Sequence, residues 1–223
     1  MAQAQPCRSS VLHQLRAGNN QFDVIVIGGG ITGAGIAREA AGSGLKTLLV
    51  EQQDFAWGTS SRSSKMVHGG LRYLGSGQFA LTRAAVRERQ RMLAEAPGLV
   101  DPLPFVMPHF RKQFPGPRVF GVLLWVYDRI AGQRTRRRLT AGETLQWIPG
   151  LTQTGLVAGN AFVDAITDDA RLVQRTLEEA RQDGACCVNY VKVDQLLREN
   201  GQAHGVRLVD QNDPMAGTFN AQA

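Results

Sequence analysis

The most constraining feature of this sequence is an apolar run that ends in a cluster of glycines. Residues 23–27 (Asp-Val-Ile-Val-Ile) are apolar enough for a strand that is buried on both faces. Gly-Gly-Gly-Ile-Thr-Gly follows at residues 28–33, and a helical pattern then continues to about Ala41. A second apolar run, residues 45–50, ends on Glu51. Strand, glycine turn, helix, strand and terminal acid together predict a βαβ unit that binds a dinucleotide.

Each part of this unit has a role toward such a ligand. Gly28 permits a tight turn, Gly30 lets the backbone approach a pyrophosphate, and Gly33 allows the helix to pack closely on the strand. Free N–H groups at the start of the helix favour phosphates. Glu51 can accept hydrogen bonds from ribose hydroxyls, and its charge repels a 2′-phosphate. We therefore expect a dinucleotide without that phosphate, with a glycine-rich turn in some other βαβ unit as the alternative.

Composition and charge limit the class of protein without identifying it. The chain has 223 residues, 43% hydrophobic and 20% charged, which is typical of a soluble globular protein with one large or two small domains. The formal net charge of +6 favours anions in general, whether phosphates, acidic lipids or nucleic acid. The cysteines, Cys7 and the adjacent pair 186–187, form no spaced framework, so we expect a reducing compartment and no metal site. The longest apolar stretch, residues 119–130, is too short to span a bilayer.

A polar loop, residues 55–73, follows the terminal acid. It carries four serines together with Arg62, Lys65, His68 and Arg72. This density of hydroxyl groups, cations and glycine backbone is suited to wrapping a long anionic ligand. NAD-binding domains usually pass from the acidic strand into a simple helix, so the loop indicates a different dinucleotide.

The two motifs together resemble the FAD-dependent, quinone-reducing glycerol-3-phosphate dehydrogenases. Val-Ile-Gly-Gly-Gly-Ile-Thr-Gly-Ala-Gly carries the first part of the resemblance. Gly-Thr-Ser-Ser-Arg-Ser-Ser-Lys-Met-Val-His-Gly-Gly-Leu-Arg-Tyr-Leu carries the more selective second part. The resemblance continues through residues 102–108 and 168–173. Where the family usually has Asp and Arg this chain has Glu39 and Ser43, and neither position lies among the phosphate-facing glycines.

The resemblance implies an α/β fold, with a Rossmann-like FAD-binding domain of the glutathione-reductase and D-amino-acid-oxidase type and an inserted, partial substrate cap. We assign residues 22–75 and 165–223 to the FAD-binding domain and residues 76–164 to the inserted segment. Residues 1–21 are expected to be a flexible leader, disordered or partly helical. Complete family members should be roughly double this length, so we expect an N-terminal fragment that is inactive alone.

The resemblance also assigns roles to residues of both motifs. Arg72 is expected to anchor the substrate phosphate or carbinol, Tyr73 to bind its hydroxyl, and His68 to be a candidate for proton transfer. The respective alternatives are a loop salt bridge, a packing ring and a structural histidine. The expected FAD contacts are Gly28, Gly29, Gly30, Thr32, Gly33, Glu51, Gln52, Thr59, Ser60, Ser61, Ser64, Lys65, His68, Gly69 and Gly70.

The activity implied by the resemblance is oxidation of sn-glycerol 3-phosphate at C2 to dihydroxyacetone phosphate, with FAD taking the hydride and a quinone the electrons. The rival functions are another FAD-dependent amine or hydroxy-acid oxidase and a non-catalytic nucleotide-binding remnant. We expect a cytoplasmic protein that is peripheral on the inner face of the cytoplasmic membrane. A homodimer is compatible with this expectation, and no nucleic-acid partner is expected.

The remaining elements follow from local patterns. Residues 79–96 predict a helix whose arginines, Arg89 among them, face outward. Residues 102–111 with three prolines predict an edge strand or an extended segment. Residues 119–131 predict an apolar helix beside the basic run 134–138. That helix either is a buried cap helix or seats the protein on an anionic bilayer.

The last part of the chain predicts alternating helices and strands. Residues 142–149 predict a short helix in which Trp147 anchors core packing. Further predicted elements are strands at 156–166, 185–193 and 205–209, and a helix capped by Asp168 or Asp169 and stopped at Gly184.

Overall fold

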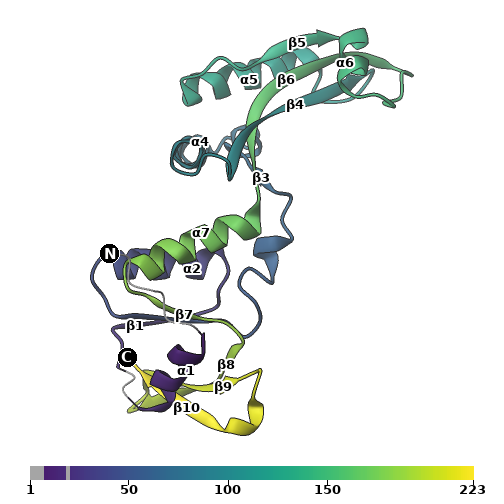
Figure 1. Cartoon of the computed structure of the whole chain (residues 1–223). Helices are drawn as coiled ribbons and strands as arrows, with labels where there is room; N and C mark the ends of the chain where they lie inside the picture. Colours follow the sequence, from purple (N-terminus) through teal and green to yellow (C-terminus); the bar gives the residue numbers. More distant parts are fainter. Residues whose placement is uncertain (1–7, 19–20) are drawn as a thin grey trace. The chain divides into compact units, whose positions relative to one another are not determined.

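The computed structural model describes residues 8–18 and 21–223, which divide into two compact units (Figure 1). The first unit combines the described residues up to Ser63 with Asp168–Ala223, and the second unit is Ser64–Thr167. The parts of the expected leader at 1–7 and 19–20, with Cys7, lie outside the described residues.

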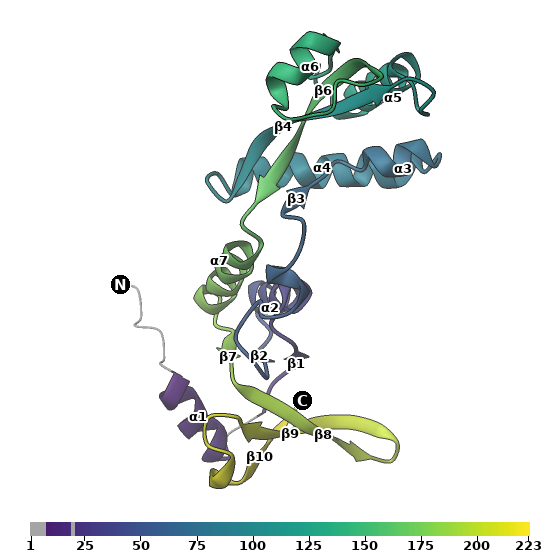
Figure 2. The ribbon, with the colours of Figure 1, turned by 90° about the vertical axis from the view of Figure 1, so that its right-hand side faces the viewer.

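A parallel sheet is the centre of the first unit. Over the described residues it has three strands, β1 (Val24–Ile27), β2 (Thr47–Val50) and β7 (Cys186–Val188), in the order β1-β2-β7. Helix α2 (Ile31–Gly42) connects β1 to β2, and α7 (Asp169–Gln182) precedes β7. Figures 1 and 2 show both helices on the same side of this sheet. The βαβ arrangement confirms the predicted α/β, Rossmann-like fold.

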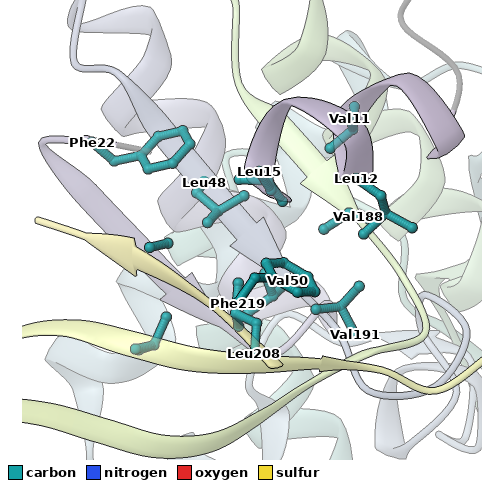
Figure 3. Packing of buried hydrophobic residues seen from close by; sticks show 12 residues of the cluster. Val11, Leu12, Leu15, Phe22, Leu48, Val50, Val188, Val191, Leu208 and Phe219 are labelled. Atoms are coloured by element: carbon teal, nitrogen blue, oxygen red, sulfur yellow. The ribbon is translucent and has the colours of Figure 1, made fainter. Parts of the chain in front are cut away.

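Strand β2 is buried on both faces because it separates two hydrophobic clusters. Leu49 packs with the small residues of α2 and the apolar stripe of α7. Leu48 and Val50 point to the opposite face, as successive residues of a strand must. There they pack with Leu208 and Phe219 in the cluster that Figure 3 shows.

An antiparallel sheet forms the other side of the cluster shown in Figure 3. Its strands are β8 (Val191–Glu199), β9 (Gln202–Asp210) and β10 (Thr218–Gln222), in the order β10-β9-β8. The strand expected at residues 185–193 is therefore two strands in different sheets. The β conformation is interrupted between the two strands at Tyr190, whose φ of +54° is incompatible with a continuous strand.

Residues 8–16 belong to the leader that the sequence predicts to be disordered or partly helical, and they form helix α1 (Arg8–Arg16). Arg8 and Arg16 both pair with the buried carboxylate of Asp210 in β9. The helix packs into the cluster of Figure 3 through three buried apolar side chains, those of Val11, Leu12 and Leu15.

The second unit is built around the long strand β6 (Leu156–Thr167). Strand β4 (Val100–Phe110) pairs along one edge of β6. Strands β3 (Met66–Val67) and β5 (Arg137–Thr140) pair with the two ends of its other edge. Strand β4 contains the three prolines and, among the residues that the structure describes, has β6 as its neighbour on one side only, so the edge-strand prediction is confirmed.

Helices pack on this sheet, and the exposure of two of their side chains shows that two sequence predictions were wrong. Arg89, expected to face solvent, is only 3% exposed, whereas Trp147, expected to anchor the core, is 46% exposed. Within residues 8–18 and 21–223 no helix has the length and apolarity needed to cross a membrane. The helices of the second unit are α3 (Leu71–Gly75), α4 (Phe79–Glu95), α5 (Pro117–Ala131) and α6 (Ala141–Trp147).

Candidate functional site

The glycine turn of the first unit requires glycine for steric reasons. Gly28 has a φ of +108°, which L side chains rarely adopt. A Cβ on Gly33 would lie 1.9 Å from the carbonyl oxygen of Gly28, so α2 can approach the end of β1 only if that residue is glycine. A Cβ on Gly30 would lie 3.1 Å from Ser60 Oγ. The turn therefore leaves bare backbone at the N-terminus of α2.

Glu51 is joined to this turn through its carboxylate. Its Oε2 accepts a hydrogen bond from the N–H of Gly29 at 2.8 Å, and its Oε1 accepts one from the N–H of Gln53 at 2.8 Å. Each carboxylate oxygen can accept a further hydrogen bond. The acid is thus held in one orientation and still has acceptor capacity for hydroxyl groups. Gln52, the neighbouring candidate, is exposed.

The serine-rich loop reaches the same helix end. Ser60 Oγ accepts a hydrogen bond from the N–H of Ile31, the first residue of α2, at 2.9 Å. The next N–H groups, including that of Thr32, have no partner one turn earlier in the helix. An anion placed there meets free donors and the positive end of the helix dipole. Thr59 and Ser61 flank Ser60 in the short helix η1 (Thr59–Ser61), Thr59 exposed and Ser61 half-buried.

Ser63 is a residue that the sequence candidates omit. Its backbone N–H and its hydroxyl both donate to Asp169 Oδ2, at 3.1 and 2.7 Å. Asp169 lies in the first turn of α7 and is 8% exposed, while Asp168 caps that helix through the N–H of Arg171. The Asp168–Asp169 pair was visible as a cap in the sequence, but its partner in the serine loop was not.

Ser64 and Lys65 open the second unit, so the candidate residues are divided between the two units. Both side chains are exposed. Lys65 has a φ of +59°, and its carbonyl oxygen accepts the N–H of Thr167 at 2.8 Å. This hydrogen bond joins the first residues of the second unit to the end of β6.

The candidates His68, Arg72 and Tyr73 lie together at the start of α3. The ring centroids of His68 and Tyr73 are 6.0 Å apart in an edge-to-face arrangement. Arg72 is exposed and forms no hydrogen bond or ion pair with any residue that the structure describes. A guanidinium with free donors is suited to binding a phosphate group. Gly70, with a φ of +78°, is the residue that precedes the helix.

Three further side chains contact this segment, and the sequence candidates missed all of them. They converge on Gly69, whose N–H donates to a buried carboxylate at 2.9 Å. Arg89 offered a signal, because it continues the stripe of Thr82 and Val86 on α4. The contacting side chains are Arg89, Tyr127 and Asp164.

The adjacent cysteines are structural. Cys186 and Cys187 lie in β7, and burial raises their pKa values to about 11 and about 12. Their thiolate fraction at neutral pH is therefore very small, which is contrary to what a nucleophile requires. Across residues 8–18 and 21–223 no group of three or more His, Cys, Asp or Glu side chains is arranged to hold a metal ion.

The first unit fits the nucleotide end of a dinucleotide. Bare backbone lies at the N-terminus of α2, and an oriented carboxylate lies beside it through the Gly29–Glu51 hydrogen bond. A side chain on Gly30 would fill the space that a phosphate needs.

Known proteins are similar to this chain in sequence. The glycerol-3-phosphate dehydrogenase of Mycobacterium leprae is 43% identical over 202 residues, which are 89% of this chain and 34% of that protein. The aerobic glycerol-3-phosphate dehydrogenase of Bacillus subtilis is 44% identical over 192 residues, 85% of this chain and 35% of that protein. The chain thus spans about a third of the length of these relatives, less than the half that the resemblance led us to expect.

The fold of this chain is also similar to that of a solved glycerol-3-phosphate dehydrogenase. The glycerol-3-phosphate dehydrogenase of Bacillus halodurans, complexed with FAD, superposes with a TM-score of 0.70 at 33% identity. The match covers 97% of this chain and 35% of that one. The sequence pattern of the FAD dependent oxidoreductase family matches residues 23–221, almost the whole chain. The chain therefore belongs to the FAD-dependent oxidoreductases.

Proposed function

We propose that this chain binds FAD and belongs to an enzyme that oxidises sn-glycerol 3-phosphate to dihydroxyacetone phosphate, with a quinone as electron acceptor. The observation that carries the cofactor part of the proposal is the 2.8 Å hydrogen bond between the N–H of Gly29 and Glu51, which holds the turn and the acid together. Because the chain spans about a third of its relatives, the activity is proposed for the whole protein that contains it.

The first unit would hold the nucleotide part of the cofactor. Glu51 would accept hydrogen bonds from the ribose hydroxyls, and the N–H groups at the start of α2 would face the pyrophosphate. Ser60 already lies at that helix end and would border the phosphates. When bound, FAD supplies the acceptor for the electrons of the substrate.

The second unit would hold the substrate. The exposed guanidinium of Arg72 would bind two phosphate oxygens at once, which is the geometry that its planar donors favour. Tyr73 would bind a substrate hydroxyl, and His68 is the candidate that would take the hydroxyl proton. The named activity of the M. leprae and B. subtilis relatives supports glycerol 3-phosphate over other alcohols.

We also propose that the protein is cytoplasmic and lies on the inner face of the membrane, where a quinone is available. The exposed face of α5 presents Val119, Val122 and Trp125 between Arg118 and Arg129. A cavity of about 410 Å³ beside this stripe is lined by Val122 and Trp125, by Arg118 and by the basic residues 136–138. Apolar side chains flanked by cations match the interface of an anionic bilayer.

Kinetics of an Arg72 variant test the substrate assignment in the full-length protein. Arg72→Ala removes a charge-assisted pair and is expected to raise the KM for glycerol 3-phosphate about 30-fold, equivalent to about 2 kcal/mol. Arg83→Ala, an exposed arginine on α4 of the same unit, is the matched control and should leave KM unchanged. An unchanged KM in Arg72→Ala contradicts the assignment.

A substrate panel separates the rival functions. Glycerol 3-phosphate should bleach the flavin absorbance of the wild-type protein, whereas amines, amino acids and unphosphorylated hydroxy acids should not. Bleaching by an amine or a hydroxy acid would identify a different oxidase. Flavin that no substrate bleaches would identify a non-catalytic nucleotide-binding protein.

A further inference from the structure

We propose that three buried side chains position the segment 68–73 and thereby act in the reaction without touching the substrate. The proposal rests on the proposed function, because it names groups that orient the residues assigned to that site. The side chains, called the positioning cluster below, are Arg89 of α4, Tyr127 of α5 and Asp164 of β6.

The carboxylate of Asp164 is the centre of the cluster. Its Oδ1 accepts the N–H of Gly69 at 2.9 Å and the hydroxyl of Tyr127 at 3.1 Å. Arg89 forms an ion pair with the same oxygen and donates to the Tyr127 hydroxyl at 2.9 Å. One backbone N–H of the segment 68–73 is thus part of a network of charged and polar groups.

Packing against Gly69 makes the network specific to this segment. A Cβ on Gly69 would lie 1.9 Å from the hydroxyl oxygen of Tyr127 and 2.8 Å from the ring carbon that bears it. The phenol therefore lies directly on the α-carbon, and only glycine lets the backbone reach Asp164. Gly70 follows with a φ of +78° and leads into α3, which carries Arg72 and Tyr73. A shift at Gly69 would be passed on to both side chains.

Because the positioning cluster is buried, we infer that it orients the segment 68–73 more than it stabilises the folded protein. Arg89 and Asp164 are each 3% exposed, and Tyr127 is 1% exposed. A buried ion pair loses much of its Coulomb energy to desolvation, so an apolar replacement of similar volume would often be as stable. Such a pair does hold directional hydrogen bonds that an apolar core cannot supply. Burial and the neighbouring Asp164 also raise the pKa of Tyr127, so its hydroxyl remains a donor.

The test compares two variants that each delete one buried hydroxyl lying over a glycine. Tyr127→Phe removes the hydroxyl over Gly69. Thr144→Val is the matched control, because Thr144 is fully buried in α6 and its Oγ1 would lie 2.6 Å from a Cβ on Gly159. Both residues belong to the second unit, but the hydroxyl of Thr144 donates to the carbonyl of Thr140 and not to the segment 68–73.

Hydrogen exchange gives a readout that does not depend on the substrate. In the full-length protein, amides of the segment 68–73 should exchange faster in Tyr127→Phe than in the wild type, and at the wild-type rate in Thr144→Val. Unchanged exchange in Tyr127→Phe would overturn the proposal. Because no substrate is added, this comparison remains decisive even if glycerol 3-phosphate fails to bleach the flavin, a result that would count against the proposed function alone.

Kinetics decide whether the positioning matters for the reaction. In Tyr127→Phe, kcat should fall about 10- to 100-fold, as expected for reacting groups that are displaced by a fraction of an ångström to 1 Å. Its melting temperature and flavin content should match those of Thr144→Val, whose kcat should stay at the wild-type value. Faster exchange with an unchanged kcat and KM would make the cluster purely structural and would overturn the proposal. If Tyr127→Phe does not fold, Arg89→Lys gives the same comparison, because it keeps the charge beside Asp164 but loses the forked donor.

Discussion

Two glycines in the same helix differ completely in what their missing side chains allow. A Cβ on Gly33 would lie 1.9 Å from the carbonyl oxygen of Gly28, whereas a Cβ on Gly35 would have no heavy atom within 4 Å. Both residues belong to α2, so their helix propensities are the same. Only the contact with the turn distinguishes the two positions.

This difference predicts opposite effects of the same substitution. Gly33→Ala should lower the free energy of unfolding by about 2–3 kcal/mol and reduce flavin content, because the helix must move away from β1. Gly35→Ala should raise that free energy by about 1 kcal/mol, because alanine is the better helix former. Urea unfolding and flavin absorbance measure both effects. Equal stabilities of the two variants would contradict the steric argument.

His109 is a residue whose protonation should affect stability. It is 2% exposed, its Nδ1 donates to the carbonyl of Pro115 at 3.0 Å, and its Nε2 accepts from the amide of Asn160 at 2.8 Å. These two partners fit one neutral tautomer. Burial lowers the pKa of His109, the carbonyl of Pro115 opposes this shift, and the charge of Arg138 adds to it.

The lowered pKa predicts the sign of a pH dependence. Below about pH 6.5 the unfolded chain binds a proton at this histidine that the folded chain resists, so stability should fall as the pH decreases. Its contribution is complete above that pH and levels off below the folded pKa. His109→Gln should therefore lose less stability than the wild type between about pH 7.5 and about pH 5 in urea unfolding. Parallel pH profiles of the two proteins would rule out a contribution from His109.

At the scale of secondary-structure elements, α1 shows that local patterns underestimate short amphipathic helices. Its apolar residues are few, yet Leu12 is only 5% exposed and belongs to a buried cluster that includes residues of β2, β7, β8, β9 and β10. The ion pairs of Arg8 and Arg16 with Asp210 add a second attachment. An isolated helix of this length is marginal in water, so tertiary contacts supply its stability.

Truncating one side chain tests whether α1 is part of the core. Leu12→Ala should lower the free energy of unfolding by about 2–4 kcal/mol, the usual cost of a cavity in a packed core. The adjacent His13 is exposed, and His13→Ala should change stability by less than about 0.5 kcal/mol. Urea unfolding measures both values. A Leu12→Ala effect as small as that of His13→Ala would mean that the helix does not stabilise the first unit.

At the scale of the whole molecule, the arginines that contribute to the net charge of +6 lie in different surroundings. Arg118 and Arg138 line the cavity that includes Trp125, whereas Arg83 and Arg87 are exposed on α4 and are not among the residues that line it. Equal charges should therefore contribute differently to membrane binding.

Vesicle binding measures this difference. Replacing Arg118 and Arg138 together with Gln should weaken binding to phosphatidylglycerol vesicles by about 2 kcal/mol, roughly 30-fold, at low salt. The charge-matched double variant Arg83→Gln/Arg87→Gln should retain most of the binding, and neutral phosphatidylcholine vesicles should bind neither protein appreciably. Equal losses in the two double variants would show that net charge, and not this face, drives the association.

Much of the first unit could be predicted from the sequence because its signals are local. An apolar run, a turn that only glycine can make, a helical repeat and a terminal acid lie within one continuous stretch, so β1, α2 and β2 follow from neighbouring residues. Asp168 likewise marks the start of α7, because its side chain caps the helix. Each of these features depends on backbone sterics or on hydrogen bonds between residues a few positions apart.

Only the tertiary structure decided what the other side chains contact. The sequence pattern predicts Arg89 on the outward face of α4, but in the structure it is buried and its ion pair joins it to a residue 75 positions later in the chain. Gly69 and Asp164 are 95 positions apart, and Ser63 and Asp169 are 106 apart. A buried polar group needs a partner, and the sequence does not reveal which distant residue supplies it. The sequence by itself therefore determined the nucleotide-binding fold, and the tertiary structure determined how the segment 68–73 is held in place.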